Sequence, residues 1–261
     1  MGLKVEGNDI NYDADYYKSC SADQLYVAIN SADVNILSAC LENPLLNEMH
    51  VIAMLRNHFI TQEIVRKICS NNTMISKYEV KAAVIHCPKA PFNLSSEYVN
   101  YLFWRDLVAV AKDNRIDPRL RVAAERLIIE KIEELSIGEK MALSRIATQQ
   151  LIRVLIKERE VKVLKELLIN PVIVEDDIIR MITTAKDASI LIEIANSQKW
   201  RFRYNIKKAL INNNLTPLGV SLNILPYLLK SDLIAITKQY TLNPMLRREA
   251  EQILGQRGLK D

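Results

Sequence analysis

The chain contains a long internal repeat, and this repeat constrains its fold more than any other feature. Residues 78–128 align with residues 204–254 at an offset of 126 without a gap, and 17 of the 51 aligned positions are identical. Nine of the other 34 pairs exchange one aliphatic side chain for another. The match continues upstream, where CLENP at 40–44 aligns with LLINP at 167–171. Self-similarity of this length is typical of repeat architectures, and it predicts two copies of one unit, residues 15–140 and 141–261.

Each copy has the pattern of short α-helices and lacks the sustained alternation of β-strands. Between Leu120 and Ile132 the apolar side chains recur with the 3.6-residue period of a helix that buries one face. Glycine accounts for only 6 of 261 residues, about a third of its usual frequency. This scarcity argues against glycine-rich phosphate loops, nucleotide-binding α/β folds and turn-dense β-sandwiches. The chain is therefore predicted to be all-α.

Proline and capping residues predict where the helices begin and end. The residue before a proline is disfavoured in the helical region, so Asn43-Pro44 and Asn170-Pro171 separate successive helices. Ser21 precedes a Gln by three residues and Ser136 precedes a Glu by three, which is the pattern of a capping box. We expect a helix to start after each of these serines.

The short helices predict a stacked arrangement. A helix of about 8–12 residues is marginal in isolation and has to be stabilised by packing on its neighbours. Short helices, regular breaks and a tandem duplication together predict a right-handed α-solenoid. We predict a single solenoid domain over residues 15–261, made of the two duplicated halves. A flexible N-terminal tail, residues 1–14, precedes it.

Two motifs carry a resemblance to known repeat families. RIDPRLRVAAERLI at 115–128 and TLNPMLRREAEQIL at 241–254 resemble the second-helix signature of HEAT-like, ARM-type repeats, with Asp or Asn, Pro, Arg, Ala and an aliphatic residue in order. LINNNLTPLGVSLNIL at 210–225 resembles the Asn-Pro-x-Thr-Pro repeat of the leucine-rich repeat variant family, with Asn214 in place of the first proline. The resemblance covers most of residues 35–257 and implies a superhelix of the kind seen in bacterial-type repeat proteins. It assigns no function, because one fold serves many.

The residues that usually carry chemistry are sparse. The four cysteines all lie in the first half, with at least 17 residues between neighbours, so the zinc spacing is absent and the iron–sulfur cluster of the leucine-rich repeat variant family is not carried over. We expect buried, reduced thiols. His50 is expected to face solvent or line a groove, and His86, which aligns with Asn212, to cap a helix. The paired Asp106 and Asp232 are interpreted as helix N-caps. We predict no catalytic residue, no cofactor, no metal site and no enzymatic activity.

One segment stands out by its charge. The chain as a whole has 35 Lys and Arg against 31 Asp and Glu, and its net charge of +4 is too small by itself to imply a polyanionic partner. Residues 194–231 nevertheless hold six basic side chains and no acidic one, and aromatic residues interleave them in KWRFRYNIKK at 199–208. The candidate binding surface consists of Trp104, Lys199, Trp200, Arg201, Arg203, Lys207 and Lys208. Trp104 is included because its counterpart is Lys230, so its ring does not belong to the shared packing pattern. Local packing of this ring is the alternative.

The same segment also has a purely structural interpretation. Phe202 continues an apolar stripe with Ile206 and Leu210 and is expected in the core. Lys207 and Lys208 then form a solvated helix face. Tyr204, which repeats Tyr78, is expected to pack between repeats.

These patterns favour two functions of different kinds. The first is a cytoplasmic, non-enzymatic scaffold that binds a protein or peptide on a solenoid face. The second is a nucleic-acid-binding protein that uses residues 199–208. Some HEAT-like solenoids are alkylpurine DNA glycosylases, so the resemblance implies base excision as the activity of such a nucleic-acid-binding protein. This second function requires Arg201, Arg203, Lys207 and Lys208 to converge on one face and to be free of acidic partners. A small-molecule or lipid groove between the halves is a third possibility.

The termini and hydropathy predict the compartment. No stretch is long and apolar enough for a transmembrane helix. The first residues lack the apolar core of a signal peptide. We therefore expect a cytoplasmic protein that does not insert into membranes, and we predict neither its oligomeric state nor the identity of its partner.

Overall fold

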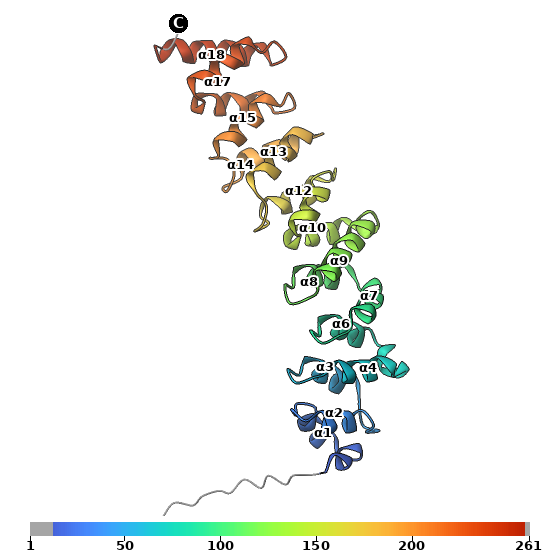
Figure 1. Cartoon of the computed structure of the whole chain (residues 1–261). Coiled ribbons are helices and arrows are strands. Elements are labelled where there is room, and N and C mark those ends of the chain that lie inside the picture. The colour runs from blue at the N-terminus through green and yellow to red at the C-terminus, as the bar shows by residue number, and fades with distance from the viewer. Residues whose placement is uncertain (1–12, 259–261) are drawn as a thin grey trace, which may run out of the picture. The chain divides into compact units, whose positions relative to one another are not determined.

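A computed structural model of the protein describes residues 13–258, and within that range all regular secondary structure is helical (Figure 1). The all-α prediction is confirmed for these residues. Most of the predicted N-terminal tail lies outside the described residues. Its last residue, Ala14, already begins a short 3-10 helix, η1 (Ala14–Lys18).

Within residues 13–258 the chain forms two compact units, the first ending at Glu130 and the second beginning at Lys131. The elements of the first unit after η1 are α1 (Ala22–Ala28), α2 (Val34–Cys40), α3 (Glu48–Arg56), α4 (Gln62–Ser70), α5 (Asn72–Ile75), α6 (Tyr78–His86), α7 (Phe92–Tyr98), η2 (Val99–Tyr101), α8 (Trp104–Lys112) and α9 (Pro118–Lys131). Those of the second unit are η3 (Ile132–Glu134), α10 (Ile137–Ile146), α11 (Gln149–Leu155), α12 (Val161–Leu168), α13 (Glu175–Thr184), α14 (Ala188–Asn196), α15 (Tyr204–Asn212), α16 (Leu218–Ile224), η4 (Leu225–Tyr227), α17 (Lys230–Lys238) and α18 (Pro244–Gln256).

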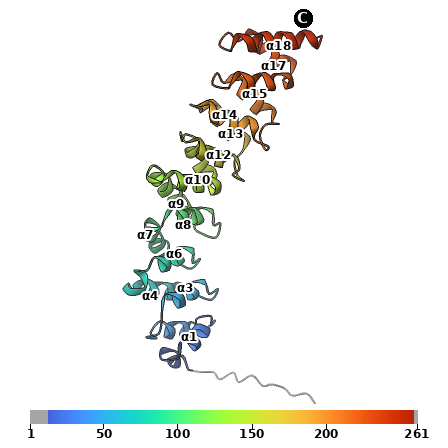
Figure 2. The ribbon, with the colours of Figure 1, turned by 180° about the vertical axis from the view of Figure 1, so that it is seen from behind.

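Within each unit the helices lie in successive layers along the chain, as Figures 1 and 2 show from opposite sides. In the first unit α2 packs on α4, α3 on α6, and α6 on α7 and α8. In the second, α12 packs on α10 and α14, α13 on α15, and α18 on α16 and α17. Each helix thus contacts helices that are close to it in sequence, which is the packing expected of helical repeats.

The helix bounds of the two units correspond as the aligned sequences do. α6 and α15, α7 and α16, η2 and η4, and α8 and α17 begin and end at positions 126 residues apart. The predicted capping boxes are both confirmed: the Ser21 side chain accepts from the Gln24 backbone, and Ser136 accepts from Glu139. Aligned residues therefore give the same local structure in both units.

The asparagines of the Asn-Pro breaks do more than end a helix. Asn170 is fully buried, and its side-chain amide donates to the carbonyl oxygens of Ser144 (2.7 Å) and Ala147 (3.2 Å) and accepts from the backbone of Val172 (2.9 Å). Asn43 makes the equivalent bonds in the first unit, with the carbonyls of Tyr17 and Cys20. Each asparagine lies in the break after one helix, and its amide donates to carbonyl groups at the end of an earlier helix. It therefore ties two layers together.

Replacing Asn170 with Ala should destabilise the second unit. The substitution leaves two buried carbonyls and one backbone N–H without their partner, and we expect the free energy of unfolding to fall by roughly 2–3 kcal/mol. Urea denaturation followed by circular dichroism measures the change. Asn214→Ala, at an exposed position, is the matched control, with an expected effect within about 0.5 kcal/mol. Equal effects of the two substitutions would contradict the role assigned to Asn170.

Candidate functional site

The two tryptophans of the candidate surface are buried. Trp104, the first residue of α8, is 8% exposed, and Trp200, in the turn between α14 and α15, is 3% exposed. The Trp200 indole N–H donates to the Leu168 carbonyl oxygen at 2.9 Å. Trp104 is therefore not on an exposed binding face, and its burial agrees with the alternative of local packing. Neither ring is available to stack on a ligand.

Phe202 was expected in the core and is instead exposed. Its side chain is 67% exposed, although the apolar stripe placed it in the core. The reason is the start of α15 at Tyr204, which leaves Phe202 in the preceding turn and off the buried face that carries Ile206. The guanidinium of Arg201 lies 4.5 Å from the centre of the Phe202 ring.

The basic side chains of the segment have different surroundings. Lys199, Arg201 and Arg203 are exposed. Lys208 forms an ion pair with Asp232 of α17, at 2.8 Å, and Lys207 lies 4.4 Å from the centre of the Tyr227 ring. One of the four cations expected to converge is thus neutralised by a carboxylate from a neighbouring helix.

The hydroxyl of a half-buried tyrosine organises the same region in each unit. Tyr78 of α6 donates to the carboxylate of Asp106 and accepts from the backbone N–H of Phe103 at 3.1 Å. Tyr204 of α15 makes the same two bonds, with Asp232 and with the backbone of Leu229 at 3.1 Å. We call this arrangement the tyrosine bridge. It joins α6 to the start of α8, and α15 to the start of α17.

The bridge corrects the interpretation of the paired aspartates. Asp106 and Asp232 were predicted as N-caps, but α8 begins at Trp104 and α17 at Lys230, so both aspartates lie within the first turn. There the negative charge is favoured by the helix dipole, and each carboxylate accepts the tyrosine hydroxyl instead of capping the backbone.

Burial and the bond to Asp106 raise the pKa of Tyr78 to about 12. The same two causes raise the pKa of Tyr204. Lys208 and the Tyr204 hydroxyl lower the pKa of Asp232. In the second unit, these shifts keep the tyrosine neutral and Asp232 ionised, which are the forms that the bridge needs.

Each bridge holds a short segment that carries exposed apolar side chains. In the first unit Tyr101 and Phe103 are 57% and 68% exposed, and in the second Tyr227 and Leu229 are 66% and 60% exposed. A lysine lies over each exposed tyrosine: Lys81 is 4.5 Å from the centre of the Tyr101 ring, and Lys207 is 4.4 Å from that of Tyr227. We call Lys81, Tyr101 and Phe103, and their counterparts Lys207, Tyr227 and Leu229, the lysine–tyrosine patches.

The patches combine a cation with exposed apolar surface. Within residues 13–258, neither Lys81 nor Lys207 forms an ion pair with a carboxylate. Each ammonium group is held over a ring and remains able to bind an anion. Of the candidate surface residues, only Lys207 belongs to a patch. The sequence signal for the patch residues that were missed was the identity of Lys81 with Lys207 and of Tyr101 with Tyr227 in the aligned copies.

The histidines and cysteines form no second centre in the described part of the chain. His50 is buried and its ring accepts from the Asn47 backbone at 3.3 Å, so the expectation of a solvent- or groove-facing side chain is wrong. His86 ends α6 and lies 3.5 Å from Asp113. The cysteines are free, with Cys69 half-buried and the others buried. No group of three metal-binding side chains occurs between residues 13 and 258.

No family model, no curated protein and no solved structure matches the chain. In the portion that the structure describes, every helix is too short or too polar to cross a bilayer. The lysine–tyrosine patches are the surface feature that both units share.

The tyrosine bridge should make the stability of the first unit depend on alkaline pH. The ordinary pKa of tyrosine is 10.0 and that of Tyr78 is about 12, so the folded state favours the neutral hydroxyl. Its contribution is fully present below about pH 10 and is lost as pH rises towards 12. Tyr78→Phe should lower stability at neutral pH by about 1–2 kcal/mol and make the alkaline decline shallower.

Urea denaturation at stepped pH measures both effects. Tyr101→Phe, which removes an exposed hydroxyl of the same type, is the control and should keep the wild-type pH profile. An unchanged slope in Tyr78→Phe would show that the bridge does not couple folding to this proton.

Proposed function

We propose that this chain is an α-helical repeat protein that binds protein or peptide partners through the lysine–tyrosine patch of each unit. In this proposal the helices of each unit stack as a right-handed, HEAT-like α-solenoid and present the patch on its surface. One observation carries it: the same cation–aromatic pair, beside an exposed apolar side chain, occurs at aligned positions of both units.

Burial does not explain why the patches are alike. Core positions of two aligned copies stay apolar because packing requires it, but Tyr101 and Tyr227 are more than half exposed. Exposed tyrosines in a fixed position are among the side chains that contribute most to protein–protein binding. The tyrosine bridge supplies that fixed position, since it anchors the backbone two residues after each exposed ring.

The chemistry of the patch suggests the chemistry of the partner. An unpaired ammonium group beside an aromatic ring and an aliphatic or aromatic side chain suits a peptide that carries a carboxylate next to an apolar residue. We therefore propose acidic, partly apolar peptides as the partners, with one binding site in each unit.

The number of sites gives a direct test. Peptides selected by display on the full chain, with acidic and apolar residues in the library, are titrated by calorimetry, and we expect two sites per chain. Tyr227→Ala should remove one site and Tyr101→Ala the other. Loss of an aromatic anchor costs about 2 kcal/mol or more, or roughly 30-fold in affinity.

Tyr240→Ala is the matched control for this test. Tyr240 is 84% exposed, and the guanidinium of Arg247 lies 5.2 Å from the centre of its ring. Its counterpart Asn114 carries no ring, so this pair is not duplicated. The substitution should leave both sites intact. Binding that is insensitive to Tyr101 and Tyr227 would contradict the proposed function.

Nucleic-acid binding is a second candidate, favoured by the exposed turn before α15. Lys199, Arg201 and Arg203 form no ion pair within residues 13–258, and Phe202 presents an exposed ring between the two arginines. Basic side chains that flank an aromatic ring suit single-stranded nucleic acid. Lys208 pairs with Asp232, Lys207 lies over Tyr227 in the lysine–tyrosine patch, and Trp200 is buried. The exposed turn itself therefore offers three cations and one ring.

A salt titration tests the second candidate. If single- or double-stranded oligonucleotides bind, log affinity should fall linearly with log salt concentration, and Arg201→Ala/Arg203→Ala should weaken binding and reduce the slope by about 2. Tyr227→Ala should have no effect on this binding. Base excision would then be assayed on the bound oligonucleotides. Absence of binding at low salt would remove this candidate.

A further inference from the structure

The second unit has an apolar groove at the C-terminal ends of α12 and α14. The cavity measures about 460 Å³ and is open to solvent. Leu168 and Ile169 line it from the end of α12. Lys165 and Glu193 also line it, and they form an ion pair of 2.9 Å. Ile169 is 67% exposed. We call this cavity the α12/α14 groove.

A buried tryptophan supports the wall of the groove. Trp200 donates its indole N–H to the carbonyl oxygen of Leu168, which is one of the lining residues. This bond satisfies a carbonyl at the end of α12 that has no partner within the helix. The backbone beneath Ile169 is thereby fixed, so the groove is formed before any ligand arrives.

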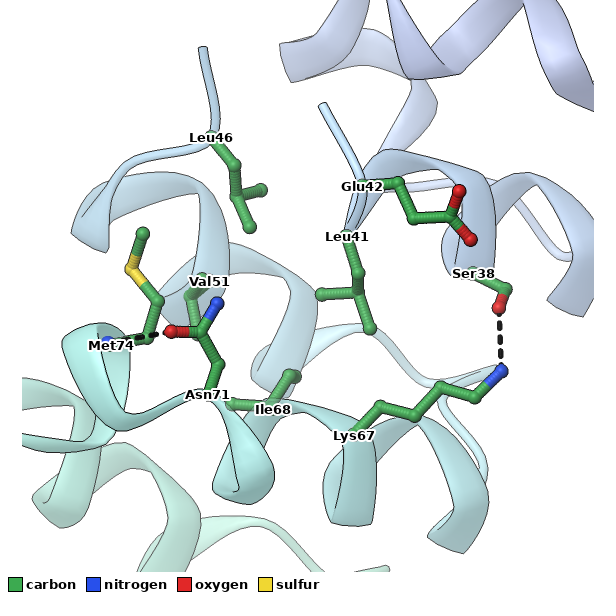
Figure 3. A pocket seen from close by; sticks show the side chains of 9 residues that line it. All are labelled: Ser38, Leu41, Glu42, Leu46, Val51, Lys67, Ile68, Asn71 and Met74. Atoms are coloured by element: carbon green, nitrogen blue, oxygen red, sulfur yellow. Dashed lines mark hydrogen bonds between the residues drawn. The ribbon is translucent and has the colours of Figure 1, made fainter. Parts of the chain in front are cut away.

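The first unit has a cavity at the aligned position, between α2 and α4 (Figure 3). Its volume is about 200 Å³. In the aligned sequences Glu42 takes the position of Ile169, and Lys67 that of Glu193. Figure 3 shows both side chains, and Lys67 donates to the Ser38 hydroxyl at 2.8 Å. Glu42 is also paired with Lys18 at 3.1 Å. The mouth of this smaller cavity is therefore occupied by charges that already have partners.

The two cavities differ in the charge of the residues at their rims. In the second unit the Lys165–Glu193 pair is neutral as a whole, and the remaining rim charge is Lys199. Its ammonium group lies 4.6 Å from the centre of the Trp200 ring and 3.4 Å from the Asn170 carbonyl oxygen. Between residues 13 and 258 no carboxylate forms an ion pair with it. Thr73 is the aligned residue of the first unit, so only the second groove combines an apolar wall with an uncompensated cation.

We propose that the α12/α14 groove is a second peptide-binding site, which takes a large aliphatic or aromatic side chain while a neighbouring carboxylate of the same peptide pairs with Lys199. The exposed Ile169 gains from being covered by an apolar group, and Lys199 gains a charge-assisted hydrogen bond. This site rests on the proposed function as a peptide binder but uses none of the lysine–tyrosine patch residues.

The position of Trp200 provides the readout. The chain has two tryptophans, so its ¹⁵N-labelled form gives two indole N–H signals: Trp200 reports on the groove and Trp104 on the first unit. The probe is an acetylated, amidated synthetic peptide with a central Leu-Asp flanked by Ala and Gly. We expect titration to shift the Trp200 signal; Trp104 follows Phe103 of the first patch, so a shift of its signal reports binding at that patch and not at the groove.

Changes in the probe separate the two halves of the interaction. Replacing its Leu with Ala should weaken binding about tenfold or more, because most of the apolar burial is lost. Replacing its Asp with Asn should weaken binding several-fold and remove most of the salt dependence. A response that ignores both changes would overturn the proposal.

The first unit supplies the substitutions for the protein. Ile169→Glu and Lys199→Thr give the second groove the residues of the first, and each should reduce the affinity at least about fivefold. Glu42→Ile, the reverse change in the first unit, is the control and should leave the Trp200 response unchanged. A far-ultraviolet circular dichroism spectrum and a urea midpoint equal to those of the wild type show that each variant is folded.

Other results would reject the assignment. Absence of any Trp200 response to the probe overturns it. Self-association detected by sedimentation and removed by Ile169→Glu would assign the groove to a second copy of the chain. A response lost in Tyr227→Ala but kept in Ile169→Glu would place the peptide on the lysine–tyrosine patch, leaving the proposed function intact. Failure of the patches to bind, with the groove response retained, would reject the proposed function alone.

Discussion

Most α-helices of residues 13–258 have seven to ten residues, and helices this short are not stable in water without burying an apolar face. Every helix therefore depends on the layer before and after it. Polar groups at the helix ends have to be satisfied where the layers meet. Side chains do this: the buried amides of Asn43 and Asn170 bind carbonyls of a preceding segment, and the tyrosine bridge joins α6 to α8 and α15 to α17.

The two units show which parts of the surface follow from the fold and which are free to differ. Both keep the tyrosine bridge and the lysine over an exposed tyrosine. The cavities at the ends of α2 and α12 have diverged, with Glu42 in one and Ile169 in the other. A duplicated scaffold of this kind can hold a shared binding chemistry in its patches and a separate one in the groove, because side chains beside a cavity carry little of the packing.

The sequence predicted much of the local structure and little of the candidate site. The capping boxes at Ser21 and Ser136 depend on residues three positions apart, so the sequence alone predicts them. The lysine–tyrosine patch depends on Lys81 and Tyr101, which are twenty positions apart and meet only after α6 packs on its neighbours. Aligned identities pointed to both residues, but identity alone does not distinguish a buried position from an exposed one.

Helical class, the position of most breaks and the aligned helix bounds of the two units follow from interactions between near neighbours in the chain. Periodicity, capping and the restriction before proline all act within a few residues. Exposure follows from contacts between layers, and there composition misleads: Trp104 is covered, whereas Phe202 is left open by a helix that starts two residues later. The same holds for charge, since Lys208 meets Asp232 and Lys199 meets no carboxylate in residues 13–258. Which lysine keeps its charge available for a partner depends on the neighbouring helix, and local sequence does not encode it.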